Sequence, residues 1–295
     1  MAATDLSPPA GAAPEGRIAV VAGGGALPVA VVRTLVAKGE APLVAVVAGE
    51  ATAADFAGAE RFDVAVEDLG PLLARLRKEG IGRVILAGSI ERRPRLSAIR
   101  WSLRLLTSLP RAAAGLLGGD DGLLRAVIGL MEANGIRVVG AHEVVPDLLA
   151  PRGVVTRAAP SAHDRRDIEA GVEAARAIGR LDIGQAAISV GGRVIALEGI
   201  EGTDGLLERT AGMRGHGRLA GKTGGVLVKC CKPQQDRRAD LPAIGPDTIG
   251  AAQAAGLAGI ALDAGSTFIL DFERTVALAD AAGLFIVGVE PGVRS

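Results

Sequence analysis

Tyrosine is absent from the sequence, and aromatic residues make up only 2% of its 295 positions. Proteins that bind single-stranded nucleic acid commonly stack its bases on aromatic side chains, and such platforms are nearly missing here. Lys plus Arg equals Asp plus Glu at 33 each, which removes the long-range positive field of a nucleic-acid-binding protein. We therefore expect no nucleic-acid partner.

Cysteine and histidine are also scarce. Cys230 and Cys231 are adjacent, so on a strand they would point to opposite faces and form neither a zinc pair nor an easy disulfide. The three histidines, His142, His163 and His216, lack the short spacing that zinc enzymes use. The sequence thus disfavours a zinc hydrolase and indicates a reducing, cytoplasmic compartment.

Long apolar runs are missing as well. No stretch reaches about 18 uninterrupted apolar residues, so we expect no transmembrane segment. Residues 1–16 are rich in Ala, Pro and Gly, carry Asp5 and Glu15, and lack the apolar core of a signal peptide. We predict that they form a disordered tail. Peripheral contact with the inner membrane and assembly into a homo-oligomer stay open at this point.

Small apolar residues are abundant: the sequence is 49% hydrophobic and contains 42 glycines. An apolar run at 17–22, a glycine turn and a helical pattern from Val29 predict the first unit of an α/β fold. Prolines at 146, 151 and 160 indicate a linker. We predict a tail (1–16), a Rossmann-like parallel-sheet domain (17–145), a linker (146–162) and a mixed α/β domain (163–295), with a ligand crevice between the two domains.

A triple glycine, Gly23–Gly25, ends the first predicted strand. It leaves backbone N–H groups free at a helix N-terminus, which suits a phosphate or a sugar. Pro28 stands where the dinucleotide-binding fingerprint has its final glycine, so the signal for a nicotinamide cofactor is weak. Glu50 does follow the second strand, the usual place of a ribose-binding acid. A nicotinamide-dependent oxidoreductase and a plain strand-to-helix turn both stay open.

Polar residues follow the buried strand Val226–Val228 abruptly. Between Lys229 and Asp240 lie four basic groups, two carboxylates and two amides: Lys229, Lys232, Arg237, Arg238, Asp236, Asp240, Gln234 and Gln235. Such a mixture can hold an anion, a metal ion or both. A solvated surface loop has a similar composition, so both interpretations remain.

Acidic residues at two predicted helix starts are equally ambiguous. Asp120 and Asp121 precede one helix, and Thr203 and Asp204 begin another, where capping alone accounts for them. Any bound metal is expected to be a hard cation held by carboxylate oxygens, such as Mg²⁺. A divalent ion next to Lys and Arg would suit phosphoryl chemistry.

The whole ordered set of motifs resembles a known family: the UDP-2,3-diacylglucosamine pyrophosphatases of lipid A biosynthesis that are unrelated to the metallophosphoesterases performing the same step. The resemblance covers nearly the whole chain after the tail. Its most specific motif is Lys229-x-x-Lys-Pro-x-Gln-Asp-x-Arg-x-Asp-Leu-Pro242. The other matching segments are Ala22–Pro28, Gly88–Ile90, Gly119–Arg125, Glu198–Asp204 and Ala264–Ser266.

The resemblance implies a lipid-linked nucleotide sugar as substrate and a Mg²⁺-dependent hydrolysis of its pyrophosphate. Water attack at the sugar-side phosphorus would yield UMP and 2,3-diacylglucosamine 1-phosphate. It also implies that Asp236 is needed for catalysis. The predicted site comprises catalytic Asp236, Lys229 and Lys232; substrate-binding Gly24, Gly25, Ala26, Leu27, Gly88, Ser89, Ile90, Thr203, Asp204, Gln235, Arg238, Gly265 and Ser266; and metal ligands Asp236, Asp120 and Asp121.

Two other functions compete with the pyrophosphatase. A nicotinamide-dependent oxidoreductase would change the absorbance of its cofactor during turnover. A non-catalytic lipid or nucleotide carrier would bind tightly without releasing UMP. Fold-level reasoning does not separate these functions, because one α/β fold hosts many chemistries.

Overall fold

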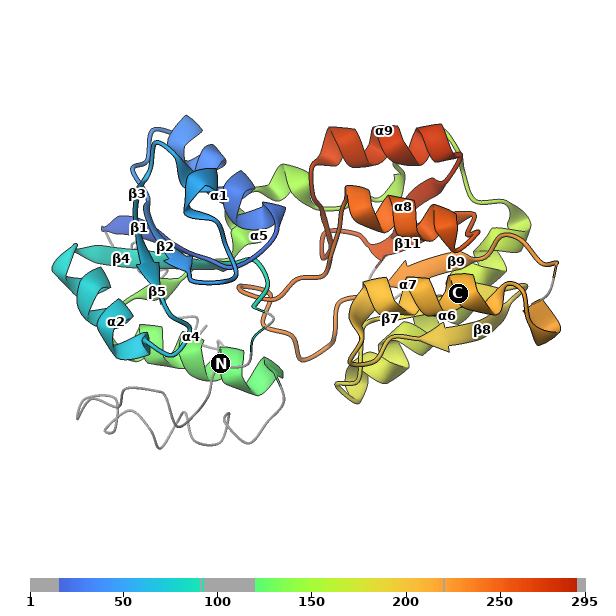
Figure 1. Ribbon diagram of the computed structural model, residues 1–295, viewed down its shortest axis with the longest axis horizontal. Helices are drawn as coiled ribbons and strands as arrows, with labels where there is room; N and C mark the ends of the chain where they lie inside the picture. Colours follow the sequence, from blue (N-terminus) through green and yellow to red (C-terminus); the bar gives the residue numbers. More distant parts are fainter. Residues whose placement is uncertain (1–15, 91, 93–119, 220, 291–295) are drawn as a thin grey trace, which may run out of the picture. The chain divides into compact units, whose positions relative to one another are not determined.

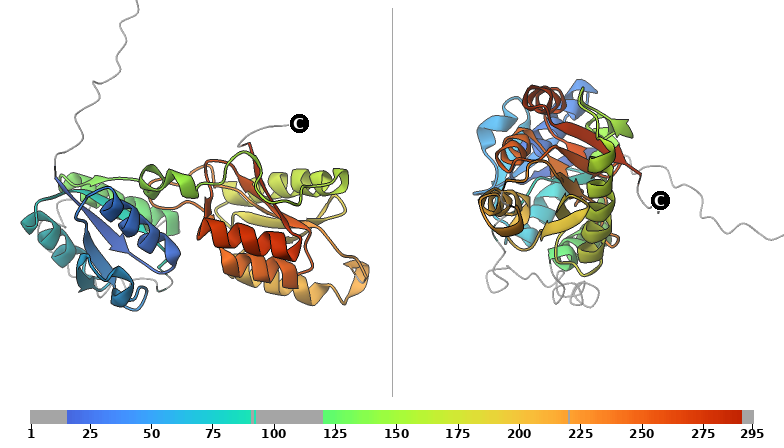
Figure 2. Two further views of the ribbon diagram at one scale, coloured as in Figure 1. Left: turned by 90° about the horizontal axis from the view of Figure 1, so that it is seen from above. Right: turned by 90° about the vertical axis from the view of Figure 1, so that its right-hand side faces the viewer.

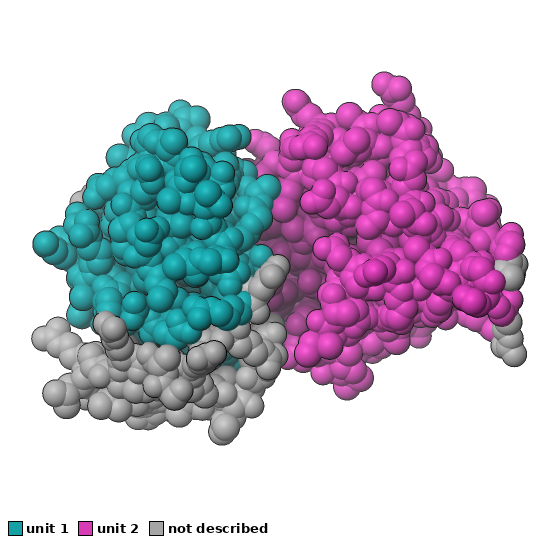
Figure 3. All heavy atoms as spheres, in the orientation of Figure 1, with its two compact units in different colours: residues 1–141 teal, residues 142–295 magenta. Residues whose placement is uncertain are grey.

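The computed structural model describes residues 16–90, 92, 120–219 and 221–290. The chain divides into two compact units, residues 1–141 and 142–295 (Figure 3). A five-stranded sheet forms the centre of unit 1, and a six-stranded sheet forms the centre of unit 2 (Figure 1). Helices and strands are mixed in both units, which confirms the expectation of two α/β domains.

Unit 1 contains a doubly wound parallel sheet. Its strands are β1 (Arg17–Ala22), β2 (Leu43–Val47), β3 (Glu60–Val64), β4 (Ile81–Ala87) and β5 (Arg137–Val138), in the order β3-β2-β1-β4-β5. Helix α1 (Ala26–Ala37) covers one face, and α2 (Leu69–Lys78) and α4 (Asp120–Ala133) cover the other (Figure 1). The Rossmann-like arrangement is therefore confirmed. The sequence also shows a helical pattern over residues 94–134, and most of that range lies outside the described residues.

Burial on both faces explains why the central strands of unit 1 are continuous apolar runs. All five residues of β2 are buried, as is typical of a parallel strand covered by helices on both sides. Helix α1 buries Pro28, Val31, Val32 and Leu35, which recur at helical spacing along one side. This helix begins at Ala26, three residues before the expected Val29, because Gly25 takes a positive φ of 88° and turns the chain directly into it.

The turns that follow β1 and β4 lie against each other. Gly24 N donates to Ser89 O at 2.8 Å, and Ser89 N donates to Gly24 O at 3.1 Å. The backbones approach so closely that a Cβ at Gly23 would lie 2.4 Å from Ser89 O, and one at Gly88 would lie 2.5 Å from Gly24 O. Gly88 also has a φ of 91°. Glycine is needed here for space as well as for backbone conformation.

Unit 2 is built on a mixed sheet. Its strands are β6 (Gly153–Val154), β7 (Ala186–Val190), β8 (Arg193–Leu197), β9 (Val226–Lys229), β11 (Gly259–Asp263) and β13 (Phe285–Val289), in the order β6-β13-β11-β9-β7-β8. β9, β11 and β13 are parallel; β7 is antiparallel to both β9 and β8. Strands β8, β9, β11 and β13 therefore end at the same edge of the sheet. A small parallel pair, β10 (Ala243–Ile244) and β12 (Phe268–Ile269), lies apart from this sheet.

Helices cover both faces of the unit 2 sheet. α6 (Ala162–Arg180) lies on one face, while α7 (Gly202–Met213), α8 (Pro246–Ala254) and α9 (Phe272–Ala282) lie on the other (Figure 2). A short helix, α5 (Ala141–Val144), begins next to the boundary between the units. The segment 146–162, expected to be a linker, contains a 3₁₀ turn (Pro146–Leu148) and β6, whose pairing with β13 joins it to the sheet.

Side chains of β9 alternate between the two cores of unit 2. Val226 and Val228 pack with the α6 side, and Leu227 packs with the side covered by α7, α8 and α9. Cys230 continues the alternation into the α6 core, and both it and Cys231 are free thiols, as the sequence predicted. By the same period of two, Lys229 lies on the α7 side at the end of the strand.

Asp167 of helix α6 binds the turn of the β7–β8 hairpin. This buried residue accepts the N–H of Gly192 with Oδ1. Gly191 and Gly192 have φ of 67° and 74°, the left-handed conformations that a two-residue hairpin turn requires.

We predict that Asp167→Ala lowers the free energy of unfolding by about 1–3 kcal/mol, because a buried hydrogen bond to a charged acceptor is lost. Urea unfolding would measure this loss. Asp167→Asn keeps one acceptor oxygen and should lose less stability. An alanine variant as stable as the wild type would refute the prediction.

A second prediction concerns the contact between the turns of unit 1. Gly88→Ala is expected to destabilise this unit by about 2 kcal/mol or more, because a strained φ and a backbone clash act together. Gly39→Ala is the matched control: Gly39 also has a positive φ, 81°, but a Cβ there would meet nothing within 4 Å. The control should lose only about 1 kcal/mol. Similar losses in the two variants, measured by denaturant unfolding, would show that the close contact contributes nothing.

Candidate functional site

Two sets of sequence-predicted residues meet in unit 1. Gly24 and Ser89 form the backbone bridge between the turns after β1 and β4, where the strand order of the sheet reverses. In doubly wound sheets, ligands bind in the crevice outside the strand ends at this point. Gly25, Ala26 and Ser89 are exposed, and no side chain from the described part of the chain caps the start of α1. The first N–H groups of this helix can therefore receive an anion.

In unit 2, Lys229 is the centre of a buried polar network on the α7 side of the sheet. Its side chain is only 7% exposed. Nζ donates to Thr203 Oγ1 at 2.9 Å and to the carbonyl oxygen of Ala243 at 2.9 Å. Thr203 in turn donates to Glu198 Oε1 at 2.6 Å, and Glu198 Oε2 accepts the N–H of Gln185 at 2.6 Å. The turn after β8, the start of α7 and the end of β9 are thus tied together.

Two opposing effects act on the charge of Lys229. Burial lowers the pKa of its ammonium group, because desolvation disfavours the charged form. Glu198, Asp204 and Asp240 act in the opposite direction, since nearby negative charge favours the ammonium. Of these effects desolvation is the larger, so the pKa of Lys229 lies below its ordinary value despite the surrounding carboxylates.

A second polar network lies on the α6 side of the same edge. Asp263, which is the last residue of β11 and is buried, accepts the N–H of Cys231 with Oδ2 at 2.9 Å. Its Oδ1 lies 3.3 Å from the guanidinium of Arg176, on α6. Lys232 Nζ pairs with Asp182 Oδ1 at 2.7 Å, just beyond the end of that helix. These contacts fix the beginning of the polar segment that follows β9.

The rest of this segment is held by its own side chains. Gln235 accepts the N–H of Lys232 at 3.1 Å and donates to Asp240 Oδ2 at 2.5 Å. Asp236 binds Arg238 with both oxygens: Oδ1 accepts from Nε at 2.9 Å, and Oδ2 accepts from a terminal nitrogen at 2.7 Å. The side chain of Asp236 remains 18% exposed and that of Arg238 35%. A carboxylate and a guanidinium are thus presented together at the surface of an ordered loop.

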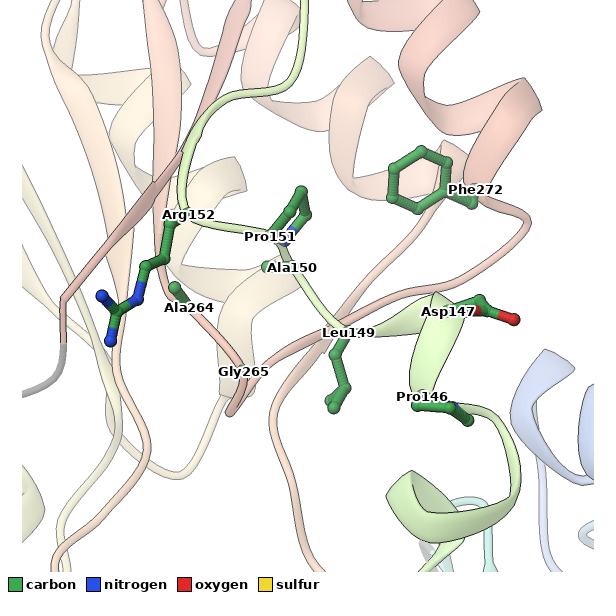
Figure 4. Close-up of a pocket in the computed structure, with 9 residues that line it drawn as sticks. All are labelled: Pro146, Asp147, Leu149, Ala150, Pro151, Arg152, Ala264, Gly265 and Phe272. Carbon is green, nitrogen blue, oxygen red and sulfur yellow. The ribbon is translucent and has the colours of Figure 1, made fainter.

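A pocket of about 490 Å³ opens beside the end of β11 (Figure 4). Leu149, Pro151 and Phe272 supply apolar side chains to its wall, and Gly265 lines it next to β11. Arg237 donates to the carbonyl oxygen of Gly265 at 2.7 Å. This contact joins the polar segment after β9, residues 230–242 and called the polar loop from here on, to the pocket. The polar loop therefore borders a pocket that can accept an apolar group.

Several sequence-predicted residues contact one another in unit 2: Lys229 contacts Thr203, Lys232 contacts Gln235, and Asp236 pairs with Arg238. Gly265 accepts from Arg237, and Ser266 N donates to the carbonyl oxygen of Asp263. Asp204 is exposed in the first turn of α7. Asp120 and Asp121 begin α4 in unit 1, and their side chains lie outside the described residues.

Sequence reasoning noted Glu198 only as the first residue of the matching segment Glu198–Asp204, and it missed Asp263 and Arg176 as site residues. Each of the two carboxylates ends or directly follows a strand, at the same edge where Lys229 lies. An acidic residue directly after an apolar run was the available signal. It does not reveal burial or partners, because those depend on strands that are distant in the sequence.

The carboxylates of the described residues do not assemble a ready-made metal cage. Among residues 16–90, 92, 120–219 and 221–290, no three His, Cys, Asp or Glu side chains converge as metal ligands. Asp236 is partly exposed and stands beside basic groups. A carboxylate of this kind supplies at most one protein ligand, and Mg²⁺ is a metal that proteins often hold through one or two carboxylates together with substrate phosphate oxygens.

Within the described part of the chain, no helix is long and apolar enough to cross a bilayer.

Comparison with known proteins places both units in one family. The family model of the LpxI N-terminal domain matches residues 17–148, and that of the LpxI C-terminal domain matches residues 151–287. A curated relative, the UDP-2,3-diacylglucosamine pyrophosphatase LpxI of Caulobacter vibrioides, is 40% identical over 286 residues, covering 94% of this chain and 99% of the relative. The chain therefore belongs to the LpxI family, as the resemblance of its motifs indicates.

Proposed function

We propose that the protein hydrolyses the pyrophosphate bond of UDP-2,3-diacylglucosamine to UMP and 2,3-diacylglucosamine 1-phosphate in lipid A biosynthesis. The observation that carries this proposal is the 40% identity, over nearly the full length of both chains, to a relative named for that activity. The clustering of basic and acidic groups at the end of β9 supports it, since a diphosphate needs positive charge around it.

The basic residues of unit 2 would neutralise the diphosphate. Lys232 and Arg238 are held by Asp182 and Asp236 respectively, so both cations have fixed positions before substrate arrives. Lys229 adds a desolvated charge at the sheet edge. Preorganised charges in a site of low dielectric constant stabilise developing charge more strongly than mobile ones.

Asp236 would act on the attacking water. Its carboxylate is oriented by the guanidinium of Arg238 and remains partly open to solvent. A carboxylate in this position can accept a proton from water as the oxygen attacks phosphorus, while the UMP phosphate departs. Attack at the sugar-side phosphorus would leave the new oxygen on 2,3-diacylglucosamine 1-phosphate.

Mg²⁺ is the cofactor that this chemistry favours, with Asp236 as its ligand from the described residues. When bound, a divalent ion polarises phosphoryl oxygens and offsets their negative charge. Asp120 and Asp121 remain proposed additional ligands.

In unit 1, Gly24, Gly25, Ala26, Leu27 and Ser89 would contact the nucleotide or its phosphates. Their support is the uncapped start of α1 beside the turn after β4. Because the substrate carries acyl chains, we place the reaction at the cytoplasmic face of the inner membrane, with the protein bound peripherally.

Replacement of Asp236 tests the site. We expect Asp236→Asn to lower kcat by roughly 10²–10⁴-fold, because the amide cannot accept the proton. Asp247→Asn is the matched control, since Asp247 is an exposed carboxylate in the first turn of α8, outside the polar loop. UMP release measures turnover, and circular dichroism checks the fold. A folded Asp236→Asn enzyme with full turnover would remove this residue from the mechanism.

Removal of divalent metal tests the cofactor. Treatment with EDTA should abolish UMP release, and added Mg²⁺ should restore it, without a change in thermal unfolding. In ¹⁸O-labelled water the label should appear in 2,3-diacylglucosamine 1-phosphate and not in UMP. Full activity in EDTA would contradict the metal requirement, and label in UMP would contradict attack at the sugar-side phosphorus. Tight binding without UMP release would instead support a carrier.

A further inference from the structure

Glu198 is a buried carboxylate, and each of its two oxygens accepts a hydrogen bond. It directly follows β8 and is 5% exposed. Oε2 accepts the N–H of Gln185 at 2.6 Å, and Oε1 accepts the hydroxyl of Thr203 at 2.6 Å. Burying a carboxylate is costly unless its oxygens are hydrogen-bonded, and here each oxygen has a donor.

The direction of these hydrogen bonds determines what Lys229 meets. An ionised carboxylate only accepts, so the single hydroxyl proton of Thr203 must point to Glu198. The oxygen of Thr203 then faces Lys229 Nζ, 2.9 Å away, as an acceptor. The carbonyl oxygen of Ala243 takes a second ammonium proton at 2.9 Å. Two of the three ammonium protons thus have fixed directions, and tetrahedral geometry then fixes the third.

We propose that Glu198 is a positioning residue: acting through the Thr203 hydroxyl, it fixes the ammonium group of Lys229 at the end of β9. The effect on catalysis rests on the proposed function, in which Lys229 is one of the basic residues that neutralise the diphosphate. The effect on Lys229 itself does not, because it is a property of the substrate-free protein.

The charges around Lys229 make the role of Glu198 measurable. Burial lowers the pKa of Lys229; the carboxylates that raise it are Glu198 on the β8–α7 turn, Asp204 on α7 and Asp240 on the polar loop. Glu198 has the largest effect of the three. Loss of its charge should therefore move the pKa of Lys229 further down.

Substitutions can separate positioning from general damage. Glu198→Gln keeps the shape, but it replaces one of the two acceptor oxygens by an NH2 donor, so Gln185 and Thr203 no longer each meet an acceptor. Thr203→Val removes the connecting hydroxyl and leaves the Glu198–Gln185 bond intact, whereas Thr203→Ser retains the hydroxyl. The matched control is Glu208→Gln, an exposed carboxylate on α7.

The titration of Lys229 is the first measurement. The lysines of the chain are Lys38, Lys78, Lys222, Lys229 and Lys232, so ¹³C-lysine spectra are simple, and loss of one resonance in Lys229→Arg assigns it. We expect its pKa to be lower in Glu198→Gln and Thr203→Val than in wild type. Thr203→Ser and Glu208→Gln should titrate like wild type.

Turnover is the second measurement. In Glu198→Gln and Thr203→Val, kcat should fall roughly tenfold or more with a smaller change in KM, because a hydrogen bond to a charged group is lost at a positioned cation. The alkaline limb of the pH–rate profile should shift to lower pH, since the ammonium is lost earlier.

An unchanged Lys229 titration in both folded variants overturns the proposal, whatever the activity. If Glu198→Gln does not fold, the comparison of Thr203→Val with Thr203→Ser decides it alone. If Lys229 responds as expected but wild type releases no UMP, the positioning role stands and the proposed function fails.

Discussion

The side chain of Lys229 is buried at the edge of a sheet, and much of the site is arranged around its amino group. A desolvated cation is costly, and the structure offsets the cost with directed acceptors and nearby negative charge. Thr203 and Ala243 supply the acceptors, while Glu198 holds the threonine hydroxyl in the required direction. The same contacts tie the end of β9 to the start of α7, so local stability and chemistry share one network.

The sheet of unit 2 makes this arrangement possible. Because β7 is antiparallel to both of its neighbours, β8 ends at the same edge as β9, β11 and β13. Alternation of side chains then divides the edge between two faces, with Lys229 toward α7 and Asp263 toward α6. The polar loop therefore begins between Lys229 on one face and Asp263 on the other, and Asp263 holds its backbone through the N–H of Cys231. Further along the loop, Asp236 and Arg238 are held by their own ion pair.

Much of the fold was accessible from sequence because it depends on short-range patterns. Apolar runs such as Leu43–Val47 identify buried strands, and glycines such as Gly191 and Gly192 identify turns that need positive φ. The site was accessible only as motifs. Asp263 was overlooked, and Glu198 was noted only as part of the segment Glu198–Asp204, because sequence alone shows neither their burial nor which backbone N–H groups they accept.

The sequence by itself determined the two α/β units, the family and the polar loop after β9, since local periodicity and motif order carry that information. Only the tertiary structure decided the burial and the hydrogen-bond partners of each charged group. The reason is that desolvation and hydrogen-bond direction arise from residues distant in sequence, as where Lys229, Thr203 and Glu198 converge from three different elements. Composition alone left the polar loop as either a surface loop or a site. The structure gives it a buried residue on each face of the sheet, Lys229 and Asp263.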